Sequence, residues 1–151
     1  MIDIDRKYLG IMMEAGYILL GMQRYKEARE VFEGVSIMAP DSEIPLVAIG
    51  SVEFCQGKFD KAIKIYKDAL KLNPESFYAK AYMGEALFFS RKKEEAVSLL
   101  KEVASSDKDG AAGGFARALL DAIEKGFDPD MLSGHKEVME YEERIRRERR
   151  S

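Results

Sequence analysis

The chain has 151 residues, of which 46% are hydrophobic and 34% charged, a composition too apolar for disorder and too charged for a membrane protein. Its net charge of −3 disfavours bulk electrostatic binding to nucleic acid, which requires a basic face. The single cysteine, Cys55, excludes an internal disulfide, and the single histidine, His135, leaves too few ligands for most metal sites, so we expect no metal and no cofactor.

The first feature along the chain is a pattern that recurs every 34 residues. Small residues mark it, namely Gly16, Gly50 and Gly84, then Ala28, Ala62 and Ala96. If each glycine is the eighth residue of a unit, the units cover residues 9–42, 43–76 and 77–110, after an N-terminal segment 1–8 that begins the first helix. A constant period of this length is typical of stacked helical repeats.

The pattern inside a unit predicts two helices joined by a tight turn. The small residues allow the two helix axes to approach closely. A large residue at the twenty-fourth position is expected to fill the layer between units: Phe32, Tyr66 and Leu100. Gly57 supplies the turn of the middle unit, and Pro74 ends its second helix. The third unit has Arg91 at the turn and Lys108 in place of proline, which predicts a looser turn and a less sharply terminated helix.

The pattern changes after residue 110. The run GAAGG over residues 110–114 predicts a flexible break, and the apolar spacing that follows predicts a helix over about 115–125. Within segment 111–127, this helix is expected to cap the last repeat, because a solenoid must cover its terminal core. Segment 128–151 is highly charged and is expected to be a helical, solubilising tail, with contact to an acidic partner or nucleic acid as the alternative.

Residues 9–110 resemble three consecutive tetratricopeptide repeats. The resemblance implies an all-α fold, a right-handed α-solenoid of three helix pairs with a capping helix and a charged C-terminal helix. It also implies that the first helix of each unit lines a concave groove through unit positions 2, 5, 6, 9, 12 and 13.

The residues at these positions predict an apolar groove. Twelve of the eighteen are aliphatic, methionine or aromatic, and none is lysine or arginine. Repeat modules that hold the C-terminal carboxylate of heat-shock chaperones use lysines there, so that function is disfavoured. We expect the groove to bind an apolar, amphipathic segment of a protein or peptide partner, with Ala48, Ser51 and Ala81 as pocket floors. The expected groove residues are Met13, Tyr17, Leu20, Val47, Ala48, Ser51, Phe54, Ala81, Tyr82, Glu85, Phe88 and Phe89.

Two alternatives remain open for these residues. They can bind a partner, or they can pack against the protein's own terminal segments or a second subunit, which would make the protein a homodimer. An enzyme is not expected: Cys55 has no histidine near it in sequence, and the chain has no glycine-rich phosphate loop.

The stretch EAGYILLGMQRYKEA, together with the small size and the pI near 5.4, is similar to the tetratricopeptide class of bacterial type III secretion chaperones. The resemblance implies a cytoplasmic, non-enzymatic chaperone that holds a secreted subunit before export. Residues 1–6 do not resemble a secretory signal, and no membrane insertion is expected. The alternative function is a general scaffold that assembles a multiprotein complex or self-associates.

Overall fold

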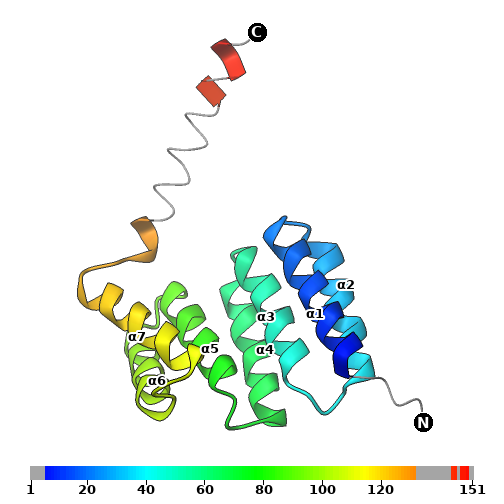
Figure 1. The fold of residues 1–151 in the computed structure, drawn as a ribbon. Helices are drawn as coiled ribbons and strands as arrows, with labels where there is room; N and C mark the ends of the chain where they lie inside the picture. Colours follow the sequence, from blue (N-terminus) through cyan, green and yellow to red (C-terminus); the bar gives the residue numbers. More distant parts are fainter. Residues whose placement is uncertain (1–5, 132–143, 146, 150–151) are drawn as a thin grey trace.

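The computed structural model describes residues 6–131, 144–145 and 147–149, and the helical tail expected over 128–151 therefore lies largely outside the described residues, as does His135. Antiparallel helix pairs stack in one row (Figure 1). The helices are α1 (Arg6–Gly21), α2 (Tyr25–Met38), α3 (Ile44–Cys55), α4 (Phe59–Leu72), α5 (Phe77–Phe89), α6 (Lys93–Ser106) and α7 (Ala111–Glu124). No strand occurs among the described residues. The all-α solenoid predicted from the sequence is confirmed.

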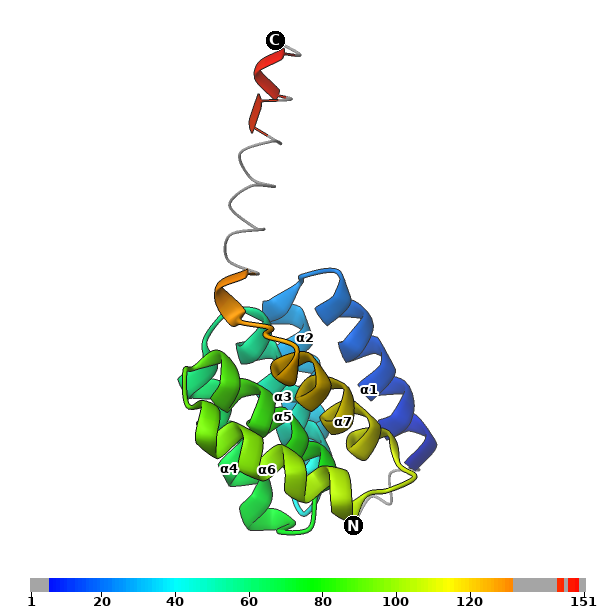
Figure 2. The same ribbon diagram turned by 90° about the vertical axis from the view of Figure 1, so that its left-hand side faces the viewer.

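The helices form two layers. The odd-numbered helices lie side by side, α1 against α3, α3 against α5 and α5 against α7, whereas the even-numbered helices pack on odd-numbered neighbours. The odd-numbered layer is therefore the more compressed, concave one. Figure 2 looks at the end of the stack formed by α6 and α7. None of the described helices is long and apolar enough to cross a membrane.

The recurring glycines mark where the helices of a pair cross. A Cβ added at Gly50 would lie 2.5 Å from the Tyr66 ring, and one at Gly84 would lie 2.8 Å from Leu100. Gly16 would clash in the same way with Phe32. The large residues therefore fill the crossing inside their own unit. The sequence predicts contacts between units, whereas the structure shows contacts within each unit as well. Tyr66 also approaches Tyr82 of the next unit, with ring centroids 6.4 Å apart.

The turns between paired helices are alike in all three units. Gly57 has a φ of +77°, and Gln23 and Arg91 adopt the same left-handed conformation, at +61° and +72°. The N–H groups of Arg91 and Lys92 donate to carbonyls of the last turn of α5 at 3.1 and 2.9 Å, as at the other turns. The looser third turn predicted from Arg91 is therefore wrong, because these two hydrogen bonds hold a non-glycine residue in the strained region.

The end of α6 also differs from the prediction. α6 ends at Ser106, and the N–H of Asp107 donates to the Val103 carbonyl at 2.9 Å, the same closure that ends α2 and α4. Lys108 in place of proline does not loosen this terminus. The carboxylate of Asp107 instead accepts a hydrogen bond from the N–H of Gly113 in α7, at 2.9 Å.

The GAAGG run is not a flexible break. α7 begins at Ala111, and Gly110 is its N-cap residue. A Cβ added at Gly113 would overlap the carbonyl oxygen of Asp107 and lie 2.8 Å from its carbonyl carbon. The glycine therefore lets α7 approach the end of α6 closely, and the small residues of the run serve packing.

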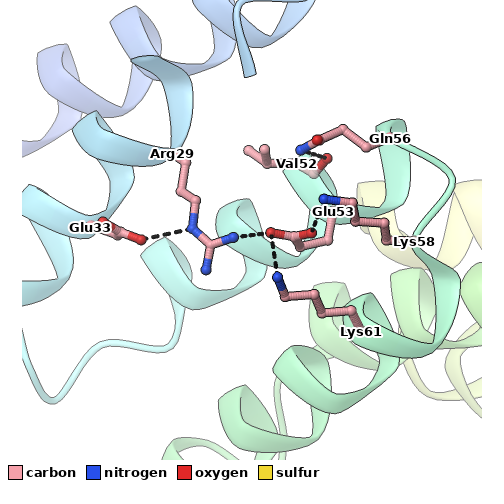
Figure 3. Close-up of polar contacts among 7 residues, drawn as sticks. All are labelled: Arg29, Glu33, Val52, Glu53, Gln56, Lys58 and Lys61. Atoms are coloured by element: carbon pink, nitrogen blue, oxygen red, sulfur yellow. Dashed lines mark hydrogen bonds and ion pairs between the residues drawn. The ribbon is translucent and has the colours of Figure 1, made fainter. Parts of the chain in front are cut away.

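A buried carboxylate joins the first two units (Figure 3). The side chain of Glu53, on α3, is only 1% exposed and forms an ion pair with Arg29 of α2. Lys61 and Lys58 lie 3.7 and 3.9 Å from its oxygens. Arg29 also binds Glu33 on its own helix, at 2.8 Å between Nε and Oε1. This network ties α2 to α3 at the joint between units.

Substitution Arg29→Met tests this joint. The variant retains the apolar stem but leaves Glu53 buried with only two more distant lysines, so we expect the free energy of unfolding to fall by about 2 kcal/mol. Arg24→Met is the matched control, because Arg24 pairs with an exposed glutamate, Glu27, and should change stability by about 0–1 kcal/mol. Urea denaturation measures both, and equal effects would show that the network does not stabilise the joint.

Candidate functional site

A cavity of about 200 Å³ opens on the concave side, between α1, α3 and α5. It is smaller than sites that enclose drug-sized ligands, which are about 300–1,000 Å³, so its size suits one or two side chains of a larger guest. Its lining is mostly apolar and aromatic: Tyr17, Glu43, Ile44, Val47, Ser76, Tyr78 and Tyr82.

Three tyrosines from two helices gather at this cavity. The rings of Tyr78 and Tyr82 stack with centroids 6.2 Å apart, and Tyr17 of α1 packs edge-on against Phe32 at 5.1 Å. Burial raises the pKa of Tyr17, and the nearby Tyr82 and Tyr78 add to the rise. Burial also raises the pKa of Tyr82. The hydroxyls of Tyr17 and Tyr82 therefore stay neutral, and both side chains can contribute apolar area and a hydrogen bond to a guest.

Helix α7 contacts one of the residues that line the cavity. Phe115 of α7 lies against Tyr82 with ring centroids 5.3 Å apart. Phe115, which directly follows the GAAGG run, thus contacts a predicted groove residue. The cap and the groove are physically continuous.

The predicted aromatic anchors of the second half of the groove are used internally. Phe54 packs against Phe59 and Phe89, with centroids 5.2 and 5.1 Å away. Phe127, just beyond α7, lies 6.0 Å from Phe88 and 6.3 Å from Phe89. This aromatic cluster belongs to the core that joins units two and three to the cap.

The twelve predicted groove residues fall into three groups by exposure. Only Tyr17 is exposed. The half-buried ones are Met13, Leu20, Ser51, Phe54, Tyr82, Glu85 and Phe89. Four are buried and offer a guest almost no surface in this conformation: Val47, Ala48, Ala81 and Phe88. The cavity brings together Tyr17, Val47 and Tyr82 from the predicted set.

Four cavity residues are outside the predicted set, namely Glu43, Ile44, Ser76 and Tyr78, and two of them are large and apolar or aromatic. Ile44 is 57% exposed and Tyr78 is 50% exposed, and each occupies the second position of its unit. That position was among the eighteen groove positions, so the repeat register alone could have indicated them. They offer more free apolar surface to a guest than the alanines do.

Ser51 does not leave an empty floor. Its hydroxyl lies 3.2 Å from the Tyr66 hydroxyl and donates to the Val47 carbonyl at 3.1 Å. Burial raises the pKa of Tyr66, so this phenol stays protonated and the contact is a neutral hydrogen bond. The space expected between the large side chains is filled here by Tyr66.

Glu85 is the unusual charge of the concave side. Burial raises the pKa of its carboxyl from 4.5 to about 7. Cys55, Tyr66 and Tyr82 are close enough for the Glu85 charge to raise their pKa values as well. For Cys55, burial is the larger cause, and a raised thiol pKa works against nucleophilic chemistry. No group of metal-ligating residues was found among the residues described.

Glu85→Gln is expected to reveal this raised pKa in the stability of the protein. A carboxyl whose folded-state pKa is raised stabilises the fold fully below pH 4.5, and this contribution is lost as the pH rises to about 7. The neutral glutamine avoids that loss, so the variant should be about 1–2 kcal/mol more stable than the native chain at pH 8 and nearly equal at pH 4.5. Glu14→Gln, at an exposed position of α1, is the control. Urea titrations at both pH values measure the difference, and parallel behaviour of the two variants would contradict it.

Comparison with known proteins shows which part of the chain resembles a known family. Residues 54–120 match the family model of the tetratricopeptide repeat, whereas no curated protein matches the sequence. The type III secretion translocator chaperone SycD of Yersinia enterocolitica is similar in structure, with a TM-score of 0.68 and 16% identity over 80% of this chain and 92% of that chain.

Two further solved structures are similar. The first tetratricopeptide domain of Spaghetti (RPAP3), bound to the HSP90 peptide SRMEEVD, has a TM-score of 0.66 at 22% identity over 83% of this chain and 97% of that chain. PcrH, known from Pseudomonas aeruginosa, in complex with the chaperone-binding region of PopD, has a TM-score of 0.65 at 12% identity over 82% and 96%. Identities this low establish the fold alone. The family-model match shows tetratricopeptide repeats within residues 54–120, and the stacked helix pairs have the fold of the tetratricopeptide domains among these structures.

Proposed function

We propose that this protein is a non-enzymatic, cytosolic chaperone that holds an apolar segment of a secreted subunit in the cavity between α1, α3 and α5. The observation that carries the proposal is an apolar concave cavity whose lining residues Ile44, Tyr78 and Tyr17 are about half exposed. Side chains of this size are rarely left in water beside a cavity without a purpose. The cavity is the docking point, and the flanking helices align the rest of the guest.

The energetics suit a peptide guest. Covering apolar surface contributes about 25 cal/mol per Å², so two or three anchors can provide several kcal/mol before the cost of association is subtracted. A client made for assembly or membrane insertion exposes such anchors and aggregates when free. Masking them needs no cofactor and no covalent step.

The charges favour an apolar client over an acidic one. Lys80 is the only lysine or arginine of α3 and α5, and its ammonium pairs with Glu102 of α6 at 2.9 Å. The similar domain of Spaghetti binds the acidic peptide SRMEEVD, whereas PcrH binds the chaperone-binding region of PopD. Because α3 and α5 offer no free lysine or arginine, the second kind of guest supports the proposal better.

The chain contains no tryptophan, which gives a clean binding assay. A synthetic amphipathic peptide with leucine anchors and one tryptophan should show a saturable blue shift of its emission on titration with the protein, because the indole enters an apolar site. Emission that does not saturate, or does not shift at all, would remove the proposed function.

Self-association is a second candidate, supported by a separate observation. A stripe of large apolar side chains, each more than half exposed, runs along α1 and ends just after it: Tyr8, Ile11, Ile18 and Met22. Ala15 stands at the centre of this stripe, and α1 lies at the end of the row of helices opposite α7 (Figure 1). SycD is also known in an alternative dimer. Sedimentation equilibrium should show a dimer that Ile18→Glu dissociates, and a monomer at all concentrations would exclude it.

A further inference from the structure

Glu85 stands in the concave layer without a partner. It lies on α5, half-buried, one turn from Tyr82 and close to Cys55 of α3 and Tyr66 of α4. Its carboxylate has neither a hydrogen bond nor an ion pair within residues 6–131. Half-buried carboxylates are ordinarily paired, since an uncompensated charge in an apolar site is costly. A function that brings a partner to this carboxylate would explain why it is tolerated.

Among the described residues, α5 and the turn after it supply no free lysine or arginine to this part of the groove. Lys80 is held by Glu102, and Arg91, beyond the end of α5, binds Asp128 at 2.9 Å and also Asp130. The other concave charge on α1 is Glu14, which has the same sign as Glu85. The groove therefore combines apolar walls with uncompensated negative charge.

We propose that the guest carries a lysine or arginine beside its apolar anchors and that Glu85 pairs with it, which makes Glu85 a determinant of guest specificity. The inference rests on the proposed function, because it names the chemistry of the segment held in the same groove. An apolar guest without a cation would cover Glu85 and bury its charge uncompensated. A guest with an acidic residue there would be repelled, so one carboxylate selects among apolar segments of similar shape.

The pKa of Glu85 predicts how the affinity for each kind of guest depends on pH. Its pKa of about 7 means that part of the population is neutral at physiological pH. A cationic guest binds the ionised form, so its affinity rises with pH and binding releases a proton. A guest without a cation binds the neutral form better, so its affinity falls as the pH rises. The direction of the pH dependence therefore distinguishes the two.

Three titratable side chains lie close enough to Glu85 to feel its charge, namely Cys55, Tyr66 and Tyr82. Burial raises the pKa values of Cys55, Tyr66 and Tyr82 above their ordinary values. On α7, the neighbouring side chain is Phe115, while the charged groups are engaged elsewhere: Arg117 donates to the carbonyls of Ala104 and Lys108, and Asp121 pairs with Lys125. On α6, Glu102 is occupied by Lys80, and on α1 Glu14 faces solvent. A pH effect on guest binding between pH 6 and 8 that Glu85→Gln removes therefore reports on Glu85, whose pKa is about 7.

The experiment uses synthetic peptides, acetylated and amidated, that share leucine anchors, one tryptophan and neutral flanks. Each set consists of three peptides that differ at one flanking position, which is lysine, glutamine or glutamate. A separate set is made for each flanking position. For at least one flanking position, we expect the lysine peptide to bind the full-length protein about tenfold more tightly than the glutamine peptide at pH 8. The advantage should shrink at pH 6, and the glutamate peptide should bind most weakly.

Two variants assign the effect. Glu85→Gln should abolish the preference for lysine and its pH dependence, whereas Glu14→Gln, on the same concave layer, should retain both. If the lysine and glutamine peptides bind alike at every flanking position, or if the preference survives Glu85→Gln, the inference is overturned while the groove function stands. If affinity for every peptide falls as the pH rises, Glu85 prefers a guest without a cation, which also overturns it. If no peptide binds, the proposed function itself fails.

Discussion

Gly113→Ala is expected to destabilise the protein by about 2–3 kcal/mol, although alanine is the better helix former. The added methyl would overlap the backbone carbonyl oxygen of Asp107, which is held in place by the closure of α6. Backbone atoms cannot rotate aside as a flexible side chain can, so α7 must move away from α6. That movement would also stretch the hydrogen bond from the Gly113 N–H to the Asp107 carboxylate.

The neighbouring glycine supplies the control. A Cβ at Gly114 would meet no atom within 4 Å, and the residue lies within α7. Gly114→Ala should therefore raise the free energy of unfolding by about 0.5–1 kcal/mol, through helix propensity and reduced freedom of the unfolded chain. Opposite signs for two adjacent substitutions in urea denaturation would locate the close approach at Gly113. Two stabilised variants would contradict the α6–α7 contact.

This pair of glycines shows where sequence reasoning was limited. GAAGG has the composition of a flexible linker, and helix propensity alone predicts a break there. The tertiary contact reverses that prediction, because Gly113 is needed for a close approach that no local pattern encodes. The start of α7 at Ala111 follows from the position of α6, and the sequence carries no periodic signal for it.

The repeat region was predictable for the opposite reason. Each crossing glycine and the large residue that covers it, such as Gly50 and Tyr66, lie at a constant separation inside one unit. A contact with a constant sequence offset appears as a period in the sequence, so fold class and helix pairing could be predicted. Arg91 breaks the expected residue type but not the turn, since backbone hydrogen bonds decide that conformation.

The groove was only partly predictable, because the position of a residue in its repeat unit determines which side of the helix it is on but not how exposed its side chain is. Phe54 and Phe89 point to the concave side of their units, yet they pack in a cluster that also contains Phe127, far along the chain. Which aromatic residues remain free thus depends on the segment after the repeats. Ile44 and Tyr78 stay free because they lie at the opposite ends of their helices, away from that cluster.

The double variant Ile44→Ser with Tyr78→Ser is expected to weaken binding of a leucine-anchored peptide by about 3 kcal/mol, or roughly 100-fold. Both side chains are at least half exposed in the free protein, so their removal costs the fold little. In the complex, the guest would cover the same surface. Removing that surface therefore weakens binding rather than destabilising the fold. Affinity is measured from the tryptophan emission of the peptide.

The matched control is Tyr8→Ser with Ile37→Ser. It also removes one tyrosine and one isoleucine, 64% and 80% exposed, but from α1 and α2, outside the cavity. This control should retain native affinity, and both double variants should unfold at nearly the native urea concentration. If the two double variants weaken binding equally, general surface hydrophobicity holds the peptide. A loss confined to Ile44 and Tyr78 places the guest in the cavity between α1, α3 and α5, because only there do these two side chains meet.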